Sequence, residues 1–223
     1  MPVLVEDVFK QVTALSRKGS TGYHSSNDFN DQCRLVQSLL YDYYFSMYEN
    51  SQRIPDSLRP FLKTPVLNVV NSILSYPADY RHRIEVAIWI VTKGAADYCA
   101  CPHVHGMEEA YASASFIRSG SIAKKRFYHC LYSTYIKIIP EAFNGVARLK
   151  YLSAPIAAFR NFTIDTANDV ENYNPIGSVN FQWESMDETN LVDLFLHLKG
   201  IQTRQSELLS WVSQKNQLSA GKN

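Results

Sequence analysis

The stretch GYHSSNDFNDQCRLVQSLLYDYYFSMYENSQRIPDSLRPFLK, residues 22–63, decides how this chain is expected to fold. After a glycine turn, Ser25 and Ser26 stand as candidate helix caps, and Asp28 falls in the first helical turn. A capping hydroxyl accepts hydrogen bonds from unpaired backbone N–H groups, and an early acid suits the positive end of the helix dipole. We therefore predict a long helix over residues 27–49.

This predicted helix carries large side chains on several of its sides. Apolar or soft residues recur at steps of three and four, which places them on one face: Phe29, Cys33, Val36, Leu40, Tyr43 and Met47. Other sides carry Leu35, Leu39, Tyr41, Tyr44, Phe45 and Tyr48. A helix with aromatic residues around most of its girth needs neighbours on more than one side. Two interpretations stay open: a core helix of an ordinary domain, or a subunit whose surface is completed by copies of itself or by other proteins.

Composition narrows the class of protein. The chain has 223 residues, of which 46% are hydrophobic and 13% aromatic, so it can bury a core. It has 22 Lys and Arg against 21 Asp and Glu, whereas duplex-DNA binders usually carry a basic excess. We expect no sequence-specific nucleic acid as partner. No apolar run approaches the roughly 18 residues that span a bilayer, so no membrane association is expected.

The expected compartment is reducing. The segment MPVLVEDVFKQV carries acids where a secretory signal would carry Lys or Arg. It is instead predicted to be an amphipathic helix, over residues 5–17. The cysteines at 33, 99, 101 and 130 need not form disulfides in a cytoplasm.

The order of the predicted elements is typical of an α+β protein. The predicted regions are an N-terminal helical region at 1–65, a strand-rich region at 66–156 forming a small antiparallel sheet or barrel, a long loop at 157–178, and a C-terminal helical region at 179–223. The last region holds two helices, 189–198 and one from Ser206, with Asp187 and Glu188 as the cap of the first and Gly200 as its end. We expect these regions to form one compact unit.

Apolar, β-branched runs locate the strands. Residues 66–74 are predicted to form one strand, and residues 84–91 a hairpin with 97–104. Residues 127–132 and 135–139 are also predicted strands. Asn144-Gly145 is the strongest hairpin-turn dipeptide, with 146–152 as its second strand.

One segment carries metal-ligand chemistry. Cys99, Cys101, His103 and His105 alternate along residues 99–105, so an extended strand would place them on one face. Their sulfur and nitrogen atoms suit tetrahedral zinc. Four donors along one straight strand cannot converge on a single ion, however, unless the chain bends at Pro102 or Cys130 and His129 contribute. We predict no metal or other cofactor, with a zinc-binding regulatory module as an alternative.

Catalytic motifs are missing from the sequence. There is no Gly-x-Ser-x-Gly elbow, no phosphate-binding glycine loop and no cysteine with an activating motif. The acids Glu108 and Glu109 are adjacent, and neighbouring helical side chains diverge by about 100°. The protein is predicted not to be an enzyme. A tail-associated carbohydrate hydrolase using Glu108 or Glu109 is kept as an alternative.

Several segments follow one another along the chain: Gly22-Tyr23 with Asp28-Phe29-Asn30 and the long aromatic helix; residues 53–62 (RIPDSLRPFL); residues 76–80 (YPADY); residues 138–140 (IIP) with 149–155 (LKYLSAP); and residues 179–184 (VNFQWE), followed by a helix, residues 199–201 (KGI) and a last helix. In this order they resemble segments of virion proteins of tailed bacteriophages of Bacteroidota, the crAss-like group and its relatives. Each motif alone is weakly specific, and their order carries the resemblance.

The resemblance implies a ring-forming connector subunit at the head-to-tail junction. It implies a homo-oligomer, a dodecamer of twelve copies matching the portal, assembled in the host cytoplasm and located in the virion. The expected partners are further copies of the chain, the portal and neighbouring tail or connector proteins. The chain itself would act as a portal adaptor or stopper. Ring contacts are heterologous, so two different surfaces must be complementary. Tyrosine is favoured at such surfaces, and we predict Tyr44, Phe45 and Tyr48 for one surface and Tyr173 for the other.

Overall fold

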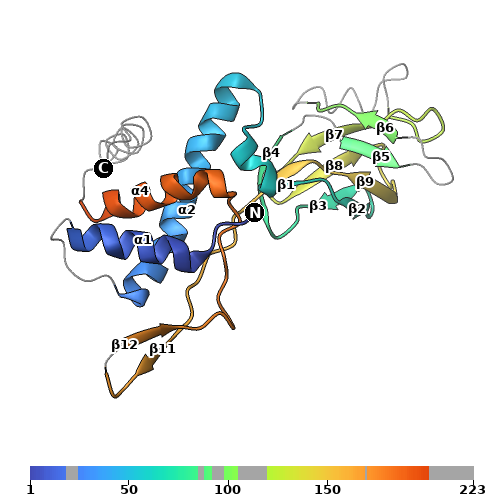
Figure 1. Ribbon diagram of the computed structural model, residues 1–223. Coiled ribbons are helices and arrows are strands. Elements are labelled where there is room, and N and C mark those ends of the chain that lie inside the picture. The colour runs from blue at the N-terminus through green and yellow to red at the C-terminus, as the bar shows by residue number, and fades with distance from the viewer. Residues whose placement is uncertain (19–24, 85–87, 92–97, 105–119, 169, 201–223) are drawn as a thin grey trace, which may run out of the picture. The chain divides into compact units, whose positions relative to one another are not determined.

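The chain folds as two compact units in the computed structural model (Figure 1). The structure describes residues 1–18, 25–84, 88–91, 98–104, 120–168 and 170–200. Unit 1 contains Met1–Phe61 and Pro155–Asn223, and unit 2 contains Leu62–Ala154. The expectation of one compact unit is therefore wrong, because the strand-rich middle builds a hydrophobic core of its own. Helices in one unit and antiparallel sheets in the other confirm the α+β class.

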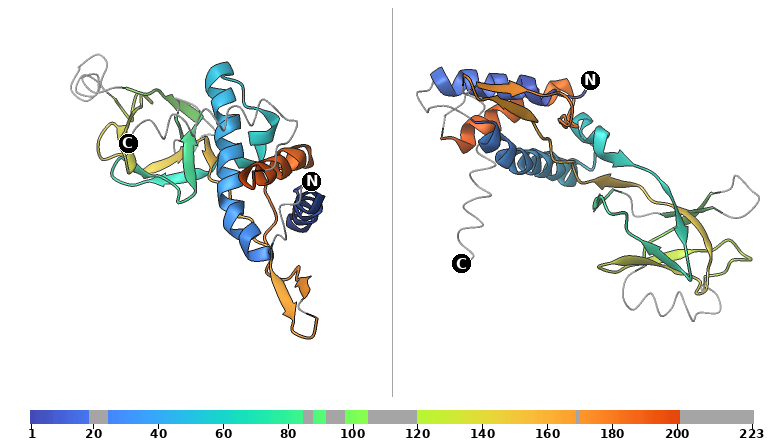
Figure 2. Two further views of the ribbon diagram at one scale, coloured as in Figure 1. Left: turned by 90° about the vertical axis from the view of Figure 1, so that its left-hand side faces the viewer. Right: turned by 90° about the horizontal axis from the view of Figure 1, so that it is seen from below.

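Unit 1 is built on three described α-helices, α1 (Val5–Lys18), α2 (Ser26–Ser51) and α4 (Glu188–Leu198). Two short 3-10 helices, η1 (Asp56–Phe61) and η2 (Ser185–Asp187), complete its helical part. Helix α4 packs against both α1 and α2, as Figure 2 shows. None of the described helices is long and apolar enough to cross a membrane.

Local signals set the ends of these helices. The Ser25 hydroxyl accepts a hydrogen bond from the Asp28 N–H at 3.1 Å, which confirms the predicted cap of α2. Helix α2 ends at Gln52, which has a φ of 55° and donates its N–H to the Tyr48 carbonyl at 2.7 Å. Gly200, with a φ of 76°, follows the end of α4 as predicted.

Stacked aromatic rings join the three helices into one core. Phe29 of α2 stacks on Phe195 of α4 with ring centroids 4.6 Å apart, and meets Phe9 of α1 edge-on at 5.3 Å. Trp183 packs edge-on against Phe61 at 4.7 Å, and both are fully buried. Fully burying such a side chain contributes roughly 1.5–3 kcal/mol, so these rings account for much of the stability of unit 1.

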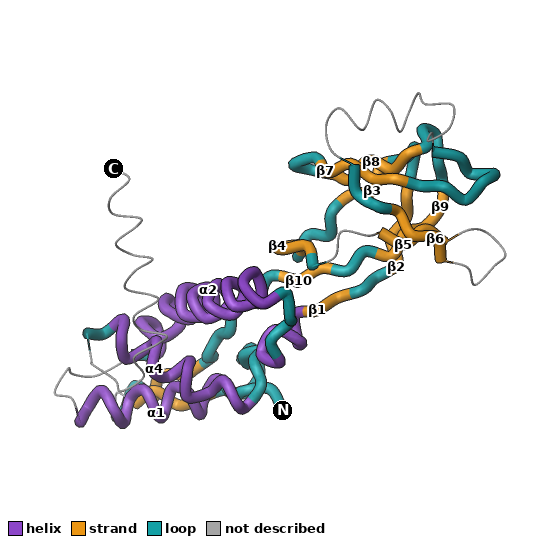
Figure 3. The backbone as a smooth tube through the Cα atoms, turned by 90° about the horizontal axis from the view of Figure 1, so that it is seen from above, coloured by secondary structure: helices purple, strands orange, loops and turns teal. Residues whose placement is uncertain are grey.

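Unit 2 consists of short antiparallel strands, coloured orange in Figure 3. Its sheets have the strand orders β1-β10-β4, β2-β9-β5-β6 and β3-β8-β7. The strands are β1 (Leu62–Lys63), β2 (Val66–Val69), β3 (Ile73–Ser75), β4 (Tyr80–Arg83), β5 (Ile88–Val91), β6 (Tyr98–Cys101), β7 (Tyr128–Leu131), β8 (Tyr135–Ile139), β9 (Gly145–Arg148) and β10 (Tyr151–Ser153). The core between them includes Leu74, Cys101, Phe127, Ile136 and Tyr151. The predicted pairing of 84–91 with 97–104 is confirmed by the antiparallel pair β5 and β6.

Two strand predictions are wrong. Residues 66–74 form two strands, because Asn71 and Ser72 adopt positive φ values of 49° and 64° and make a two-residue hairpin turn. Asn144-Gly145 does not join a hairpin: β8 pairs with β3 and β7, whereas β9 pairs with β2 and β5. The Asn144 side chain instead accepts the Asn71 N–H at 2.9 Å, so it connects two loops.

The predicted loop at 157–178 is also wrong in its centre. There β11 (Phe162–Asp165) and β12 (Val170–Tyr173) form an antiparallel hairpin. It belongs to unit 1 and appears in Figure 1 as an arm beside the helices. The helix predicted from Ser206 lies outside the described residues.

Candidate functional site

The β11–β12 hairpin and its flanks are the candidate assembly surface of unit 1. The exposed fraction is 56% for Ile164 and 50% for Val170, one on each face of the hairpin. Further exposed apolar side chains lie on the same segment: Ile156, Phe159, Ile176 and Val179. Exposed apolar side chains that gather in one patch are typical of protein contact sites, which makes this segment a candidate.

Both strands of the hairpin are edge strands. β11 and β12 form a two-stranded sheet, so each has an outer edge with no described strand against it. Edge strands of monomers usually carry Lys, Pro or a bulge to prevent pairing with other chains. The strands FTID and VENY contain no Lys or Pro and their register runs without a bulge, but they are only four residues long and carry Asp165 and Glu171. The hairpin therefore offers both backbone and apolar groups to a partner.

A buried arginine fixes the base of the hairpin. Arg160 is only 3% exposed, and its Nε donates to Glu6 Oε2 of α1 at 2.7 Å. Its Nη1 donates to the Ser26 hydroxyl at the start of α2 and lies 3.9 Å from Glu171 Oε2 of β12. The guanidinium carbon lies 4.0 Å from the centroid of the Phe9 ring. One cation thus connects α1, α2 and β12.

Amide hydrogen bonds reinforce this base. Asn30 of α2 donates from Nδ2 to the Arg160 carbonyl at 3.0 Å and accepts the Arg160 N–H on Oδ1 at 2.8 Å. The Glu171 carboxylate also accepts the Ser26 N–H and hydroxyl at the positive end of α2. At the tip, Asp165 accepts the Ala167 N–H at 3.0 Å, which closes an Asx turn. The hairpin is therefore held in one conformation at both ends.

The predicted interface tyrosines have different environments from those expected. Tyr48 is wrong as a surface residue, because it is 8% exposed in the single chain. Tyr44 is half-buried, and its hydroxyl donates to Asp187 Oδ1 at 2.6 Å and accepts from Asn190 at 2.9 Å. Phe45 is half-buried beside Tyr48, with ring centroids 5.9 Å apart. Phe45 keeps part of its ring at the surface, whereas Tyr44 serves internal packing.

Tyr173 does lie on the candidate assembly surface. It ends β12 and is half-buried, with the Arg160 guanidinium carbon 5.5 Å from its ring centroid. Its position close to the anchoring arginine makes it part of the base of the hairpin rather than of the exposed tip.

Asp187 was predicted to cap α4, and this is wrong. It occupies the N-cap position but makes no capping hydrogen bond, because its Oδ1 accepts the hydroxyls of Tyr44 and Ser57 at 2.6 and 2.8 Å. Its Oδ2 is buried and has no hydrogen-bond partner in the part of the chain that the structure describes. Burial raises the pKa of Asp187, and the two hydroxyl bonds oppose that shift only in part. Burial also raises the pKa of Tyr44, to about 12.

Replacing Asp187 with asparagine is expected to stabilise the protein at pH 8, and the gain should shrink as the pH falls towards 4. The folded-state pKa is raised, so the carboxyl contributes stability below its unfolded pKa and loses it as the pH rises through the folded pKa. Asparagine still accepts both hydroxyls but carries no buried charge. Thermal unfolding followed by circular dichroism from pH 4 to 8 measures the difference.

Asp79→Asn provides a control of opposite sign. Hydrogen bonds from Lys63 and from the Tyr151 hydroxyl at 2.7 Å lower the pKa of Asp79. This variant should therefore lose stability by the same amount from pH 8 down to pH 4, because the contribution of Asp79 is lost only below its unfolded pKa, as the pH falls towards the lower folded value. An Asp187→Asn variant that is destabilised equally at every pH would contradict the assignment.

The cysteine–histidine segment lies partly in the core of unit 2. Cys101 is fully buried and Cys99 is half-buried against the same core. His103 is half-buried next to His129, with ring centroids 5.2 Å apart. His105 lies outside the described residues, as do Glu108 and Glu109. Among the residues that are described, no three His, Cys, Asp or Glu side chains are grouped so that they could hold a metal ion.

The β11–β12 hairpin and the role of Arg160 at its base were not predicted from the sequence. The alternation of apolar and polar residues in FTID and VENY was an available signal for two strands, separated by the turn-forming stretch at 166–169. The Arg160 cluster had no such signal, because Glu6, Ser26 and Glu171 are far apart in the sequence. Neither a scan of protein-family models nor a search of curated proteins finds a match to this chain.

Proposed function

We propose that this protein is a virion structural subunit that forms a ring in the head-to-tail connector of a tailed bacteriophage. It acts by packing against other proteins, as an adaptor or stopper between portal and tail. The proposal starts from the ordered sequence segments that resemble connector proteins of the crAss-like group. That resemblance implies twelve copies in the virion, assembled in the host cytoplasm.

The β11–β12 hairpin is the observation that supports this role best. A two-stranded hairpin is marginally stable in water by itself, yet here a buried arginine and paired amides hold it beside the helices. Its Ile164 and Val170 are exposed beyond that anchor, and both of its strands are edge strands. This is the arrangement expected of an arm that reaches a neighbouring subunit.

A closed ring needs a second, complementary surface on each subunit. We assign the hairpin of one copy to contact the next copy, with α2 around Phe45 as the candidate receiving surface. Phe45 lies half-buried on α2, with its ring centroid 5.9 Å from that of Tyr48. The portal and the neighbouring tail proteins would then bind other faces of the ring.

Substituting Ile164 by glutamate is expected to leave the subunit folded and to abolish ring formation. The side chain is 56% exposed, and surface substitutions usually change stability by no more than about 0.5 kcal/mol. A charge in an apolar contact, by contrast, must be desolvated on assembly. Native mass spectrometry over a range of protein concentrations measures the oligomer, and circular dichroism verifies the fold.

Ile122→Glu is the matched control, because Ile122 is 52% exposed but lies in unit 2. It should assemble as the wild type does. Rings of unchanged size and stability from the Ile164→Glu variant would exclude the hairpin as a ring contact.

A further inference from the structure

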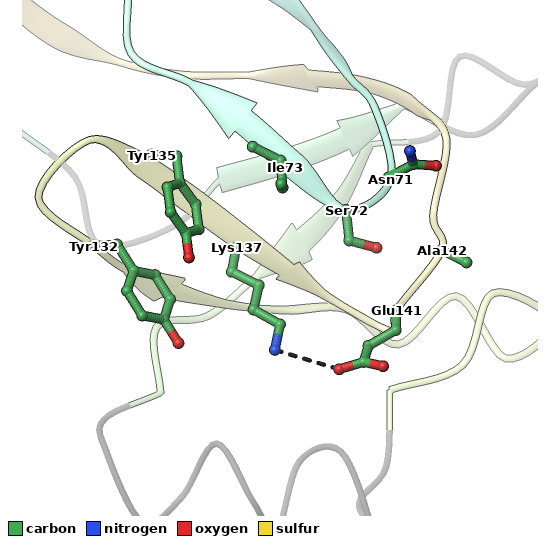
Figure 4. Close-up of a pocket in the computed structure, with 8 residues that line it drawn as sticks. All are labelled: Asn71, Ser72, Ile73, Tyr132, Tyr135, Lys137, Glu141 and Ala142. Carbon is green, nitrogen blue, oxygen red and sulfur yellow. Dashed lines mark ion pairs between the residues drawn. The ribbon is translucent and has the colours of Figure 1, made fainter.

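Unit 2 contains an open cavity of about 420 Å³ whose walls carry paired tyrosines and an ion pair (Figure 4). This volume lies within the range of roughly 300–1,000 Å³ common for small-molecule sites. The lining comes from the β2–β3 turn and β3, from the β7–β8 turn, from the first half of β8 and from the loop after it. The lining residues are Asn71, Ser72, Ile73, Tyr132, Tyr135, Lys137, Glu141 and Ala142.

Hydrogen bonds make the loop wall of this cavity rigid. The buried Ser72 donates its hydroxyl to the Pro140 carbonyl at 2.9 Å and accepts the Phe143 N–H at 2.8 Å. Its backbone N–H donates to the Phe143 carbonyl at 2.8 Å. Ala142 has a φ of 60°, a costly conformation for a residue with a side chain, and costly backbone conformations of this kind concentrate at binding sites. The cavity is therefore formed before any ligand arrives.

A stacked pair of tyrosine rings supplies an apolar wall. Tyr132 and Tyr135 stack with centroids 4.7 Å apart and an interplanar angle of 16°. Tyr132 is 38% exposed, and the neighbouring Ile73 is 43% exposed. In Figure 4 both rings lie beside the Lys137 side chain and on the same side of β8. A ligand with a flat C–H face can pack on this wall while its edge meets polar groups.

The polar groups are balanced in charge. Lys137 Nζ lies 3.3 Å from Glu141 Oε1, so one cation and one anion of the lining offset each other. Asn71 adds an amide that can donate and accept. Among the described lining residues, the wall thus offers donors and acceptors within reach of each other, and the charges of Lys137 and Glu141 sum to zero.

We propose that this cavity binds a neutral carbohydrate. A pyranose has an apolar C–H face that can pack on a tyrosine, and vicinal hydroxyls that both donate to a carboxylate and accept from an ammonium group. An anionic ligand would need an unbalanced cation, which the described lining residues do not offer. The cavity lies wholly within unit 2, so this inference is independent of ring assembly.

The test is ligand-observed saturation-transfer NMR on the full chain with maltotriose, cellotriose and chitotriose as probes. We expect at least one of them to bind in the millimolar range typical of small, open sites, and not to be displaced by adenosine or by trigalacturonate. Tyr132→Ala should weaken binding about tenfold, the usual loss on removing one stacking ring. Tyr132→Phe, which keeps the ring, should retain most of the affinity.

Glu141→Gln is a second variant, because Tyr132 also closes the β7–β8 turn and its removal can affect folding. The Glu141 side chain is 72% exposed, so the variant should fold and still bind several-fold more weakly. Glu184→Gln, an exposed glutamate in unit 1, should bind as the wild type does. Absence of transfer to every neutral sugar, binding unchanged in folded Tyr132 and Glu141 variants, or stronger binding of adenosine or trigalacturonate would each overturn the proposal.

Discussion

Replacing Arg160 with alanine is expected to lower the free energy of unfolding by about 3–5 kcal/mol. The side chain is 3% exposed, and its removal leaves Glu6 and Glu171 with little solvent and without their main cation. The variant also loses the stacking of the guanidinium on the Phe9 ring. Urea unfolding followed by tryptophan fluorescence measures the loss.

Lys10→Ala is the matched control, because Lys10 pairs with the same carboxylate, Glu6, at 3.5 Å. The Lys10 side chain is 68% exposed, so this pair is solvated and should contribute at most about 0.5 kcal/mol. Losses of similar size in the two variants would contradict the buried arginine as the anchor of the hairpin.

Acidification from pH 6.5 to about 4 is expected to destabilise the protein by roughly 3 kcal/mol through His129 alone. The ring is fully buried, and burial lowers the pKa of His129 to about 4, against the opposing effect of the Cys101 carbonyl. Because the folded pKa is depressed, the unfolded chain binds the proton first. Stability is therefore present above the unfolded pKa and is lost as the pH falls towards the folded value.

The His129→Asn variant should lose less stability than the wild type when the pH falls from 6.5 to about 4. An asparagine amide can replace the ring Nδ1, which lies 2.6 Å from the Cys101 carbonyl, but it does not titrate. The unfolding free energy of the variant is compared with that of the wild type at pH 7 and again at pH 4.5. Asp187 and the other titrating groups are present in both proteins, so their contributions cancel in each difference. A difference that does not change with pH would contradict the assignment.

The helices of unit 1 were predictable because their signals are local. The Ser25 cap, the apolar spacing of α2 and the glycine after α4 each act within a few residues, and the observed elements follow them. The hairpin between residues 66 and 75 was missed because Asn71-Ser72 is a weaker turn signal than Asn-Gly. The hairpin predicted at Asn144-Gly145 is wrong because the partners of a strand depend on the whole sheet. Strand β9, which begins at Gly145, pairs with β2 and β5 and not with β8.

The candidate surface was only partly predictable for a similar reason. Helical spacing shows that Tyr41, Tyr43, Tyr44 and Tyr48 cannot all face one core, but it does not show what covers the other faces. In the structure the internal partner of Tyr44 is Asp187, from a distant segment. The Arg160 cluster likewise depends on α1, α2 and β12 meeting, which no local pattern reveals.

Ring assembly is the central claim, and electron microscopy with native mass spectrometry of the purified full chain, alone and mixed with portal complexes, tests it most directly. We predict closed rings of one size with rotational symmetry, twelve copies by the resemblance, that bind to the portal. The Ile164→Glu variant should remain monomeric under the same conditions. A chain that is strictly monomeric at every concentration and also fails to join portal complexes would contradict the account.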